Sequence, residues 1–223
     1  MDLYIAEPKT TPKGGIVVIQ EAFGVTSHIE DVCDWLADNG WYALAPTLFH
    51  RLETQVFGYD DLAPVMPAMK SLNKADIDAD LDDAFGHLLS KGFDIAKCGI
   101  VGFCMGGSVA LYVAATRTIG AAVGFYGGGL GESRFGFPPG IELAGQLQSP
   151  WLGLYGDLDP MIPVDQVEAA RRAAATCSVP SEVVRYENGQ HGFNCDDRPA
   201  VFDADIAADA RKRTLAWFDK YCV

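Results

Sequence analysis

Histidine is scarce in this chain, and basic residues are well outnumbered by acidic ones. Lys and Arg total 17 of the 223 residues against 30 Asp and Glu, which leaves a net charge of −13 at pH 7. Such an acidic surface repels phosphate backbones and anionic membranes, so we expect neither a nucleic-acid partner nor a membrane partner. Any chemistry that needs an imidazole is confined to four positions, His28, His50, His87 and His191.

The chain also lacks the patterns of a disulfide scaffold, a zinc site or an exported protein. Its six cysteines are widely spaced with no CxxC, which excludes zinc-ribbon and thioredoxin-like folds. The first residues show no basic stretch followed by an apolar one, so we expect no signal peptide. Residues 119–131 form a long uncharged stretch that is too short to cross a bilayer of about 30 Å. We therefore expect a cytoplasmic protein without metal or cofactor, as a monomer or a weak homodimer.

Short apolar runs alternate with longer amphipathic segments along the whole chain. We expect strands at residues 15–20, 41–46, 98–103, 121–126, 151–155 and 182–186. We expect helices at about residues 26–39, 76–89, 105–116, 163–176 and 202–221, and an irregular excursion over the end of the sheet at residues 47–73. This alternation predicts one α/β domain over residues 1–223, with a mostly parallel sheet covered by helices on both faces. In such sheets the active site lies at the carboxyl ends of the strands.

The strongest local motif is Gly102-Phe-Cys-Met-Gly-Gly107, between a predicted strand and a predicted helix. It has the pattern of the G-x-S-x-G nucleophile elbow, with Cys104 in the place of serine. The flanking glycines leave room for the sharp turn, and the dipole of the following helix stabilises a thiolate. Free cysteines are also commonly buried for structural reasons. We nevertheless interpret Cys104 as a nucleophile.

A nucleophile elbow needs an acid and then a histidine later in the chain. His191, in Gln190-His-Gly-Phe193, is the one histidine between the predicted acid and the last helix. His28 and His87 fall in helical segments, where we expect solvated or partly buried side chains. His50 lies at a strand end and could line the site without being the base.

Two aspartates follow the strand that ends at residue 155. Asp159 is followed by Pro160 and leads into the next helix, whereas Asp157 follows a glycine and could instead cap the turn. We favour Asp159 as the acid and keep Asp157 as the alternative. The order Cys104, Asp159, His191 is then that of a hydrolase triad.

The oxyanion of a tetrahedral intermediate needs two backbone N–H donors. The residue after the nucleophile, Met105, supplies one, and Ala22 after the first buried strand is the natural second donor. Glu21, at the end of that strand, could pair with an arginine or a helix N-terminus. Placed near Cys104, it could instead hydrogen-bond the thiol and restrain it until substrate arrives.

Several of these segments together resemble the dienelactone hydrolase family of small α/β-hydrolases with a Cys-His-Asp triad. The matching segments are Val18–Gly24, Leu44–Pro46, Gly102–Gly107, Gly124–Gly127, Asp159 with Pro163, and Gly189–Phe193. The resemblance implies the α/β-hydrolase fold, Cys104 as nucleophile, His191 as base and Asp159 as its orienting acid. It also implies Glu21 as the restraint on the resting thiol and Ala22 and Met105 as the oxyanion hole. The best-known activity of the family opens the lactone ring of dienelactone to give maleylacetate.

The substrate-binding residues of that family have no full counterpart here. Members that act on dienelactone hold its carboxylate with arginines, one of them shortly after the catalytic histidine. In this chain Cys195 lies four residues after His191, the next basic residue is Arg198, and residues 52–73 contain no arginine. We take Arg51, Arg198, Phe23 and Tyr126 as candidate substrate-binding residues, with Arg134 as a further cation.

We therefore predict a hydrolase that cleaves a small-molecule ester or enol-lactone through a cysteine acyl-enzyme. A carboxylesterase or thioesterase of the same fold, acting on a neutral ester, is the alternative. A non-catalytic, redox-sensing protein that uses Cys104 for oxidation chemistry is a third hypothesis. The presence of both Asp159 and His191 argues against the last one.

Overall fold

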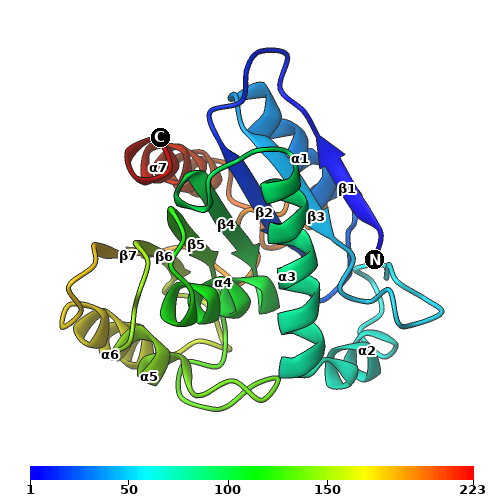
Figure 1. The fold of residues 1–223 in the computed structure, drawn as a ribbon. Coiled ribbons are helices and arrows are strands. Elements are labelled where there is room, and N and C mark those ends of the chain that lie inside the picture. The colour runs from blue at the N-terminus through cyan, green and yellow to red at the C-terminus, as the bar shows by residue number, and fades with distance from the viewer.

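The computed structural model describes residues 1–223, and its centre is a seven-stranded sheet (Figure 1). The strands lie in the order β1-β3-β2-β4-β5-β6-β7, and every neighbouring pair is parallel except β1 with β3. Their bounds are β1 Leu3–Ala6, β2 Gly15–Ile19, β3 Tyr42–Pro46, β4 Cys98–Phe103, β5 Ala121–Phe125, β6 Trp151–Gly156 and β7 Ser181–Tyr186. The interior strands β2 to β6 are buried along their whole length, which explains their continuous apolar sequences.

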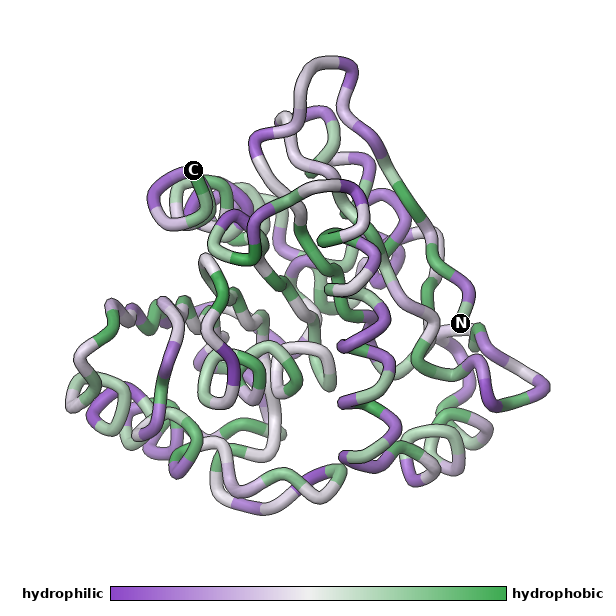
Figure 2. The backbone as a smooth tube through the Cα atoms, viewed as in Figure 1, coloured by the Kyte–Doolittle hydropathy of each residue, from purple (hydrophilic) through white to green (hydrophobic).

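Helices cover both faces of this sheet. In Figure 1, α3 and α4 lie in front of the strands, while α1 and α7 lie behind them. The helices are α1 Ser27–Asp38, α2 Val65–Ser71, α3 Lys74–Ser90, α4 Met105–Thr116, α5 Gly140–Ala144, α6 Val164–Ala174 and α7 Ala204–Tyr221, with a 3₁₀ turn η1 at Ile95–Lys97. In Figure 2 the central strands are largely green and much of α3 is purple, as expected for a buried sheet beside a solvent-facing helix. No helix is long and apolar enough to span a membrane.

The strand register brings three candidate site residues to one edge. Ile19 at the end of β2 pairs with Gly102, and Phe103 at the end of β4 pairs with Phe125 at the end of β5. The residues that follow these strands therefore emerge side by side at the carboxyl edge. Those residues are Gln20 and Glu21 after β2, Cys104 after β4 and Tyr126 after β5.

The predicted order of strands and helices is confirmed, with boundaries displaced by one or two residues. The six predicted strands and five predicted helices are all present. The short elements β1, α2 and α5 were not predicted, because segments of four to seven residues carry too little periodicity. The excursion of residues 47–73 does cover the carboxyl edge: the N–H of Phe57 donates to the carbonyl of Phe23, just after β2.

Candidate active site

Cys104 occupies the sharp turn between β4 and α4. Its φ of 53° and ψ of −115° lie in a region that residues with a side chain rarely adopt. Such strain is typical of a nucleophile elbow. The turn needs Gly102, because a Cβ at that position would collide with the carbonyl oxygen of Gly106. The partly exposed thiol is thus held at the N-terminus of α4, whose dipole favours a thiolate.

His191 lies in the connection between β7 and α7 and is paired with a buried carboxylate. Its Nδ1 is 2.6 Å from Oδ2 of Asp159, whose side chain is fully buried. The other carboxylate oxygen, Oδ1, accepts the backbone N–H of Met161 at 2.8 Å. Asp157, the alternative acid, binds Arg185 through both oxygens at 2.7 Å instead. The structure therefore brings Asp159, and not Asp157, to the imidazole.

The far nitrogen of this imidazole is open. His191 Nε2 is buried and has no hydrogen-bond partner. Burial lowers the pKa of His191, but the negative charge of Cys104 and the hydrogen bond to Asp159 outweigh it and raise the pKa to about 10. A negative charge at Cys104 therefore favours the protonated form of His191.

Glu21 is the second buried acceptor beside the thiol. Its side chain is 1% exposed; Oε1 accepts the Tyr126 hydroxyl at 3.2 Å, and Oε2 has no partner. Burial raises the pKa of Tyr126 well above 10, and the charges of Glu21 and Cys104 add to this shift. Tyr126 therefore stays protonated and donates to Glu21. Its ring lies 5.1 Å from the His191 ring, so this tyrosine contacts both Glu21 and His191.

The two candidate oxyanion donors come from neighbouring strands. Met105 is the first residue of α4, so its N–H has no partner within the helix. The N–H of Ala22, just after β2, donates no hydrogen bond. Both N–H groups are therefore available at the edge where Cys104 lies.

Arg198 packs against two adjacent aromatic rings. Its guanidinium is 5.6 Å from the ring centroid of Phe23 and 5.9 Å from that of Tyr59, and the two rings are 4.6 Å apart. The hydroxyl of Tyr59 is 3.0 Å from Oγ1 of Thr26 and accepts the Cys195 thiol at 3.5 Å. Sequence reasoning missed Tyr59, because nothing in the irregular residues 47–73 shows which aromatic faces Phe23.

The other candidate cations are held by carboxylates. Arg51 binds Asp80 with two nitrogens, each at 2.8 Å, and none of its hydrogen bonds reaches the residues around Cys104. Asp80 also pairs with His50 at 3.1 Å, so His50 serves this cluster. Arg134 pairs with Glu132 at 3.0 Å. Arg198 has no carboxylate partner, which leaves its charge available to a ligand.

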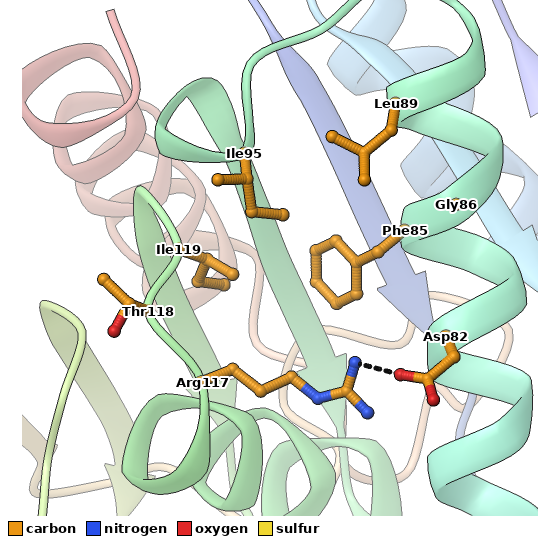
Figure 3. A pocket seen from close by; sticks show the side chains of 8 residues that line it. All are labelled: Asp82, Phe85, Gly86, Leu89, Ile95, Arg117, Thr118 and Ile119. Atoms are coloured by element: carbon orange, nitrogen blue, oxygen red, sulfur yellow. Dashed lines mark ion pairs between the residues drawn. The ribbon is translucent and has the colours of Figure 1, made fainter.

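Two cavities of similar volume lie near opposite ends of the strands, one near the carboxyl ends and one near the amino ends. One of about 290 Å³ is beside the candidate acid, between Arg134 and the Pro160–Met161 segment. The other, of about 280 Å³, is lined by Phe85, Leu89 and other residues near the amino ends of β4 and β5 (Figure 3). The Arg117–Asp82 ion pair flanks this second cavity. No candidate site residue lines it, so it is separate from the candidate active site.

The strand order, the elbow and the His-Asp pair define the chain as an α/β-hydrolase. A family model described as "Dienelactone hydrolase family" matches residues 1–222. The chain belongs to the dienelactone hydrolase family, and it is an ester or lactone hydrolase, as the motifs predicted.

Individual relatives agree with this assignment. A Yersinia pestis protein provisionally assigned as a carboxymethylenebutenolidase is 36% identical over 225 residues, which cover 99% of this chain and 84% of the relative. The carboxymethylenebutenolidase of Pseudomonas putida is 28% identical over 215 residues, or 95% of this chain and 87% of that enzyme. A crystal structure from Klebsiella pneumoniae, provisionally assigned as a dienelactone hydrolase, has a TM-score of 0.89 at 36% identity and covers 98% of this chain and 92% of its own. The predicted α/β-hydrolase fold is thereby confirmed.

Proposed function

We propose that Cys104, His191 and Asp159 are the nucleophile, base and orienting acid of an enzyme that opens a carboxylated enol-lactone. The observation that carries this proposal is the imidazole of His191, fixed at Nδ1 by Asp159 at 2.6 Å and open at Nε2 beside Cys104. A base that is oriented on one side and free on the other matches the general form of a nucleophilic triad. The Pseudomonas putida relative is named a carboxymethylenebutenolidase, a name that denotes hydrolysis of a carboxylated butenolide.

Acylation begins when His191 takes the thiol proton and the sulfur of Cys104 attacks the lactone carbonyl. The carbonyl oxygen becomes an oxyanion that accepts the N–H groups of Ala22 and Met105. The bond to the ring oxygen then breaks, and its electron pair leaves on that oxygen as an enolate. The His191 imidazolium protonates the enolate to the enol, which leaves a thioester on Cys104. Enolates are good leaving groups, which suits a cysteine nucleophile.

Deacylation uses the same groups with water in place of the thiol. His191 removes a proton from water, and the resulting hydroxide attacks the thioester carbonyl. The carbon–sulfur bond breaks, the product leaves as a carboxylic acid, and the proton on His191 returns to the Cys104 sulfur. Asp159 stabilises the imidazolium that forms in both halves of the reaction.

Glu21 restrains the thiol in the resting enzyme. The thiol has one proton to donate, and two buried acceptors near it, Glu21 Oε2 and His191 Nε2, have no other partner. While the thiol donates a hydrogen bond to Glu21, the sulfur keeps its proton; when His191 takes the proton, the sulfur becomes a nucleophile. Glu21→Gln should change the rate of Cys104 alkylation by iodoacetamide at neutral pH, and an unchanged rate would remove this role.

Arg198 is the proposed partner of the substrate carboxylate, with Phe23 and Tyr126 as walls of the site. An anionic lactone that approaches a protein of charge −13 needs local positive charge. Arg198 supplies it because its guanidinium has no carboxylate partner, whereas Asp80 occupies Arg51. Charged hydrogen bonds of this kind contribute about 1.5–3 kcal/mol, or roughly 10- to 150-fold in affinity.

The test compares an anionic and a neutral substrate. Arg198→Gln should raise KM for dienelactone at least about tenfold and leave hydrolysis of p-nitrophenyl acetate within about twofold. Arg134→Gln, whose guanidinium is held by Glu132, is the matched control and should change neither. Hydrolysis of p-nitrophenyl acetate without any turnover of dienelactone would instead assign the chain to the neutral-ester alternative. Cys104→Ala with full activity on both would overturn the triad.

We further propose that residues 1–223 act as one catalytic unit in a reducing cytoplasm, as a monomer or a weak homodimer. The six cysteines are all free thiols, which suits such a compartment. Sedimentation of the purified chain across a concentration series tests the oligomeric state. A tight dimer at nanomolar concentration would contradict it.

A further inference from the structure

The loop that carries the proposed base has little structure of its own. This segment, residues 187–203 between β7 and α7, is called the base loop here, and it holds His191, Cys195 and Arg198. Its internal hydrogen bonds close short turns, such as Cys195 N–H to the carbonyl of Gly192 at 2.9 Å, and one longer span, from Asp203 N–H to the carbonyl of Phe193 at 3.1 Å. Contacts with other elements fix its position: the Leu158 N–H donates to the carbonyl of Gly189 at 2.9 Å, Asp159 binds His191, and further side chains hold Asp196 and Asp197.

Two of those side chains come from the first turn of α1. The Ser27 hydroxyl donates to Asp197 at 3.0 Å, and His28 Nδ1 lies 2.9 Å from Oδ1 of Asp196. His28 is fully buried, which differs from the solvated or partly buried side chain expected from its helical position. A buried polar ring is costly unless both of its nitrogens are paired, and here both are.

The direction of each hydrogen bond in this cluster can be assigned. Arg211 Nε, from α7, lies 3.0 Å from Oδ1 of Asn194, and an arginine can only donate. The Asn194 amide is thereby oriented with Nδ2 toward His28 Nε2, at 3.4 Å. Nε2 must then accept, so the proton of the neutral ring is on Nδ1 and is donated to Asp196. The opposite tautomer would place two donors face to face in an interior where Asn194 is 0% exposed.

His28 also lies where the three segments of the proposed site meet. It follows Glu21 and Ala22 by only a few residues, and it holds the base loop through Asn194 and Asp196. Its ring packs edge-on against Phe103, the neighbour of Cys104, with centroids 6.1 Å apart. One side chain thus links the oxyanion segment, the nucleophile strand and the base loop.

We infer that His28 is a positioning residue, which in its Nδ1-protonated neutral form fixes His191 relative to Cys104 and Ala22 through the base loop. This inference rests on the proposed function, since it assigns His28 a role in the same reaction. A misplacement of about 1 Å between reacting groups costs on the order of 100-fold in rate. His28 acts at a distance from the chemistry, and its effect falls on the rate of the bound complex.

The first experiment separates positioning from mere folding. His28→Phe should lower kcat for p-nitrophenyl acetate about 10- to 100-fold, with KM within about threefold. His87→Phe is the matched control, because His87 is also a helical histidine with one hydrogen bond, 3.0 Å from the Tyr42 hydroxyl, and it should keep the wild-type kcat. A wild-type kcat in His28→Phe would overturn the inference.

If His28→Phe does not fold, variants of Asp196, the exposed partner of His28, provide a second test. The Asp196 side chain is 55% exposed, so its replacement leaves no cavity. Asp196→Ala removes the acceptor and should lower kcat about three- to tenfold, whereas Asp196→Asn keeps an accepting oxygen and should restore most of it. Equal wild-type values of kcat in both variants would also overturn the inference.

A spectroscopic measurement tests the tautomer without any substrate. Long-range ¹H–¹⁵N correlation spectra of the wild-type protein distinguish the two tautomers, and the chain has only four histidines to assign. The expected result is a neutral His28 with its proton on Nδ1; a proton on Nε2, or on both nitrogens at pH 7, would contradict the inference. Failure of the proposed function would appear separately, as a wild-type enzyme that hydrolyses neither ester nor lactone.

Discussion

Two histidines of this chain pair with an aspartate through Nδ1, but only one of them has a second nitrogen without a hydrogen-bond partner. His191 pairs with Asp159 at 2.6 Å, and His28 pairs with Asp196 at 2.9 Å. Both rings are buried, but the Asp159 side chain is fully buried while that of Asp196 is 55% exposed. The two rings differ at the second nitrogen: Nε2 of His191 has no hydrogen-bond partner, whereas Nε2 of His28 faces Asn194.

The comparison shows that a buried His–Asp pair is not by itself a catalytic feature. Asp159 orients an imidazole whose second nitrogen can take and return a proton. The cluster around His28 uses both nitrogens for hydrogen bonds within the protein, and so it contributes fixed geometry. The same two residue types thus form the proposed base in one place and the proposed structural link in the other.

The largest expected effect comes from replacement of His191, whose Nε2 has no hydrogen-bond partner. His191→Gln should lower kcat/KM for p-nitrophenyl acetate on the order of 10⁴-fold, because no other group can take the thiol proton. The change at the paired ring, His28→Phe, should cost far less. Steady-state kinetics on both variants make the comparison, and equal losses would show that the two rings do not differ in role.

The two aspartates should differ when each loses its charge but keeps its shape. Asp159→Asn should lower kcat about 10³-fold, because an amide N–H can face Nδ1 and leave the imidazole in the wrong tautomer. Asp196→Asn should stay within about twofold of wild type, since its exposed side chain can rotate an oxygen toward His28. A comparable loss of kcat in both variants would contradict the division of roles.

Removal of the partner of His28 Nε2 should affect stability more than chemistry. Asn194→Ala leaves the buried Nε2 of His28 unpaired and removes the acceptor of the part-buried Arg211, and it should lower the free energy of unfolding by about 1–3 kcal/mol in urea titrations. Thr214→Val is a matched control, because it removes a buried hydroxyl that bonds only the Ala210 carbonyl, 2.8 Å away within α7. If Asn194→Ala lowers the free energy of unfolding no more than the control does, the hydrogen bond between Asn194 and His28 does not hold this cluster together.

The pH dependence of the free energy of unfolding should reflect His191, whose Nε2 has no hydrogen-bond partner. The folded pKa of His191, about 10, lies above its usual 6.5, so the protonated ring stabilises the fold fully below pH 6.5. This contribution is lost as the pH rises toward 10, with a slope of at most about 1.4 kcal/mol per pH unit. Urea titrations between pH 6.5 and 10 should show a steeper decline for wild type than for His191→Gln. Parallel curves would contradict the raised pKa of His191.

The order of the motifs predicted which sequence positions form the candidate site, whereas the hydrogen-bond partners of the side chains required the structure. The elbow around Cys104 and the later positions of Asp159 and His191 follow from local sequence, because each lies within a few residues of the end of a recognisable strand. The burial of His28 could not be predicted, since its partner Asp196 is 168 residues away. The fate of Arg51 was equally hidden, because its partner Asp80 comes from a helix whose acidic residues appear solvent-facing in sequence.

The position of the base loop near the end of the chain has a consequence for biosynthesis. A ribosome delivers the strand and turn of Cys104 well before residues 187–203, and the contacts of His28 with this loop join positions 28 and 196. A nascent chain can therefore fold most of the sheet while its strained cysteine has no base beside it. Under the proposed mechanism, acyl transfer becomes possible only after this loop, in about the last sixth of the chain, has been made and docked onto the first helix. Synthesis and the onset of reactivity are in this way coupled through one late loop.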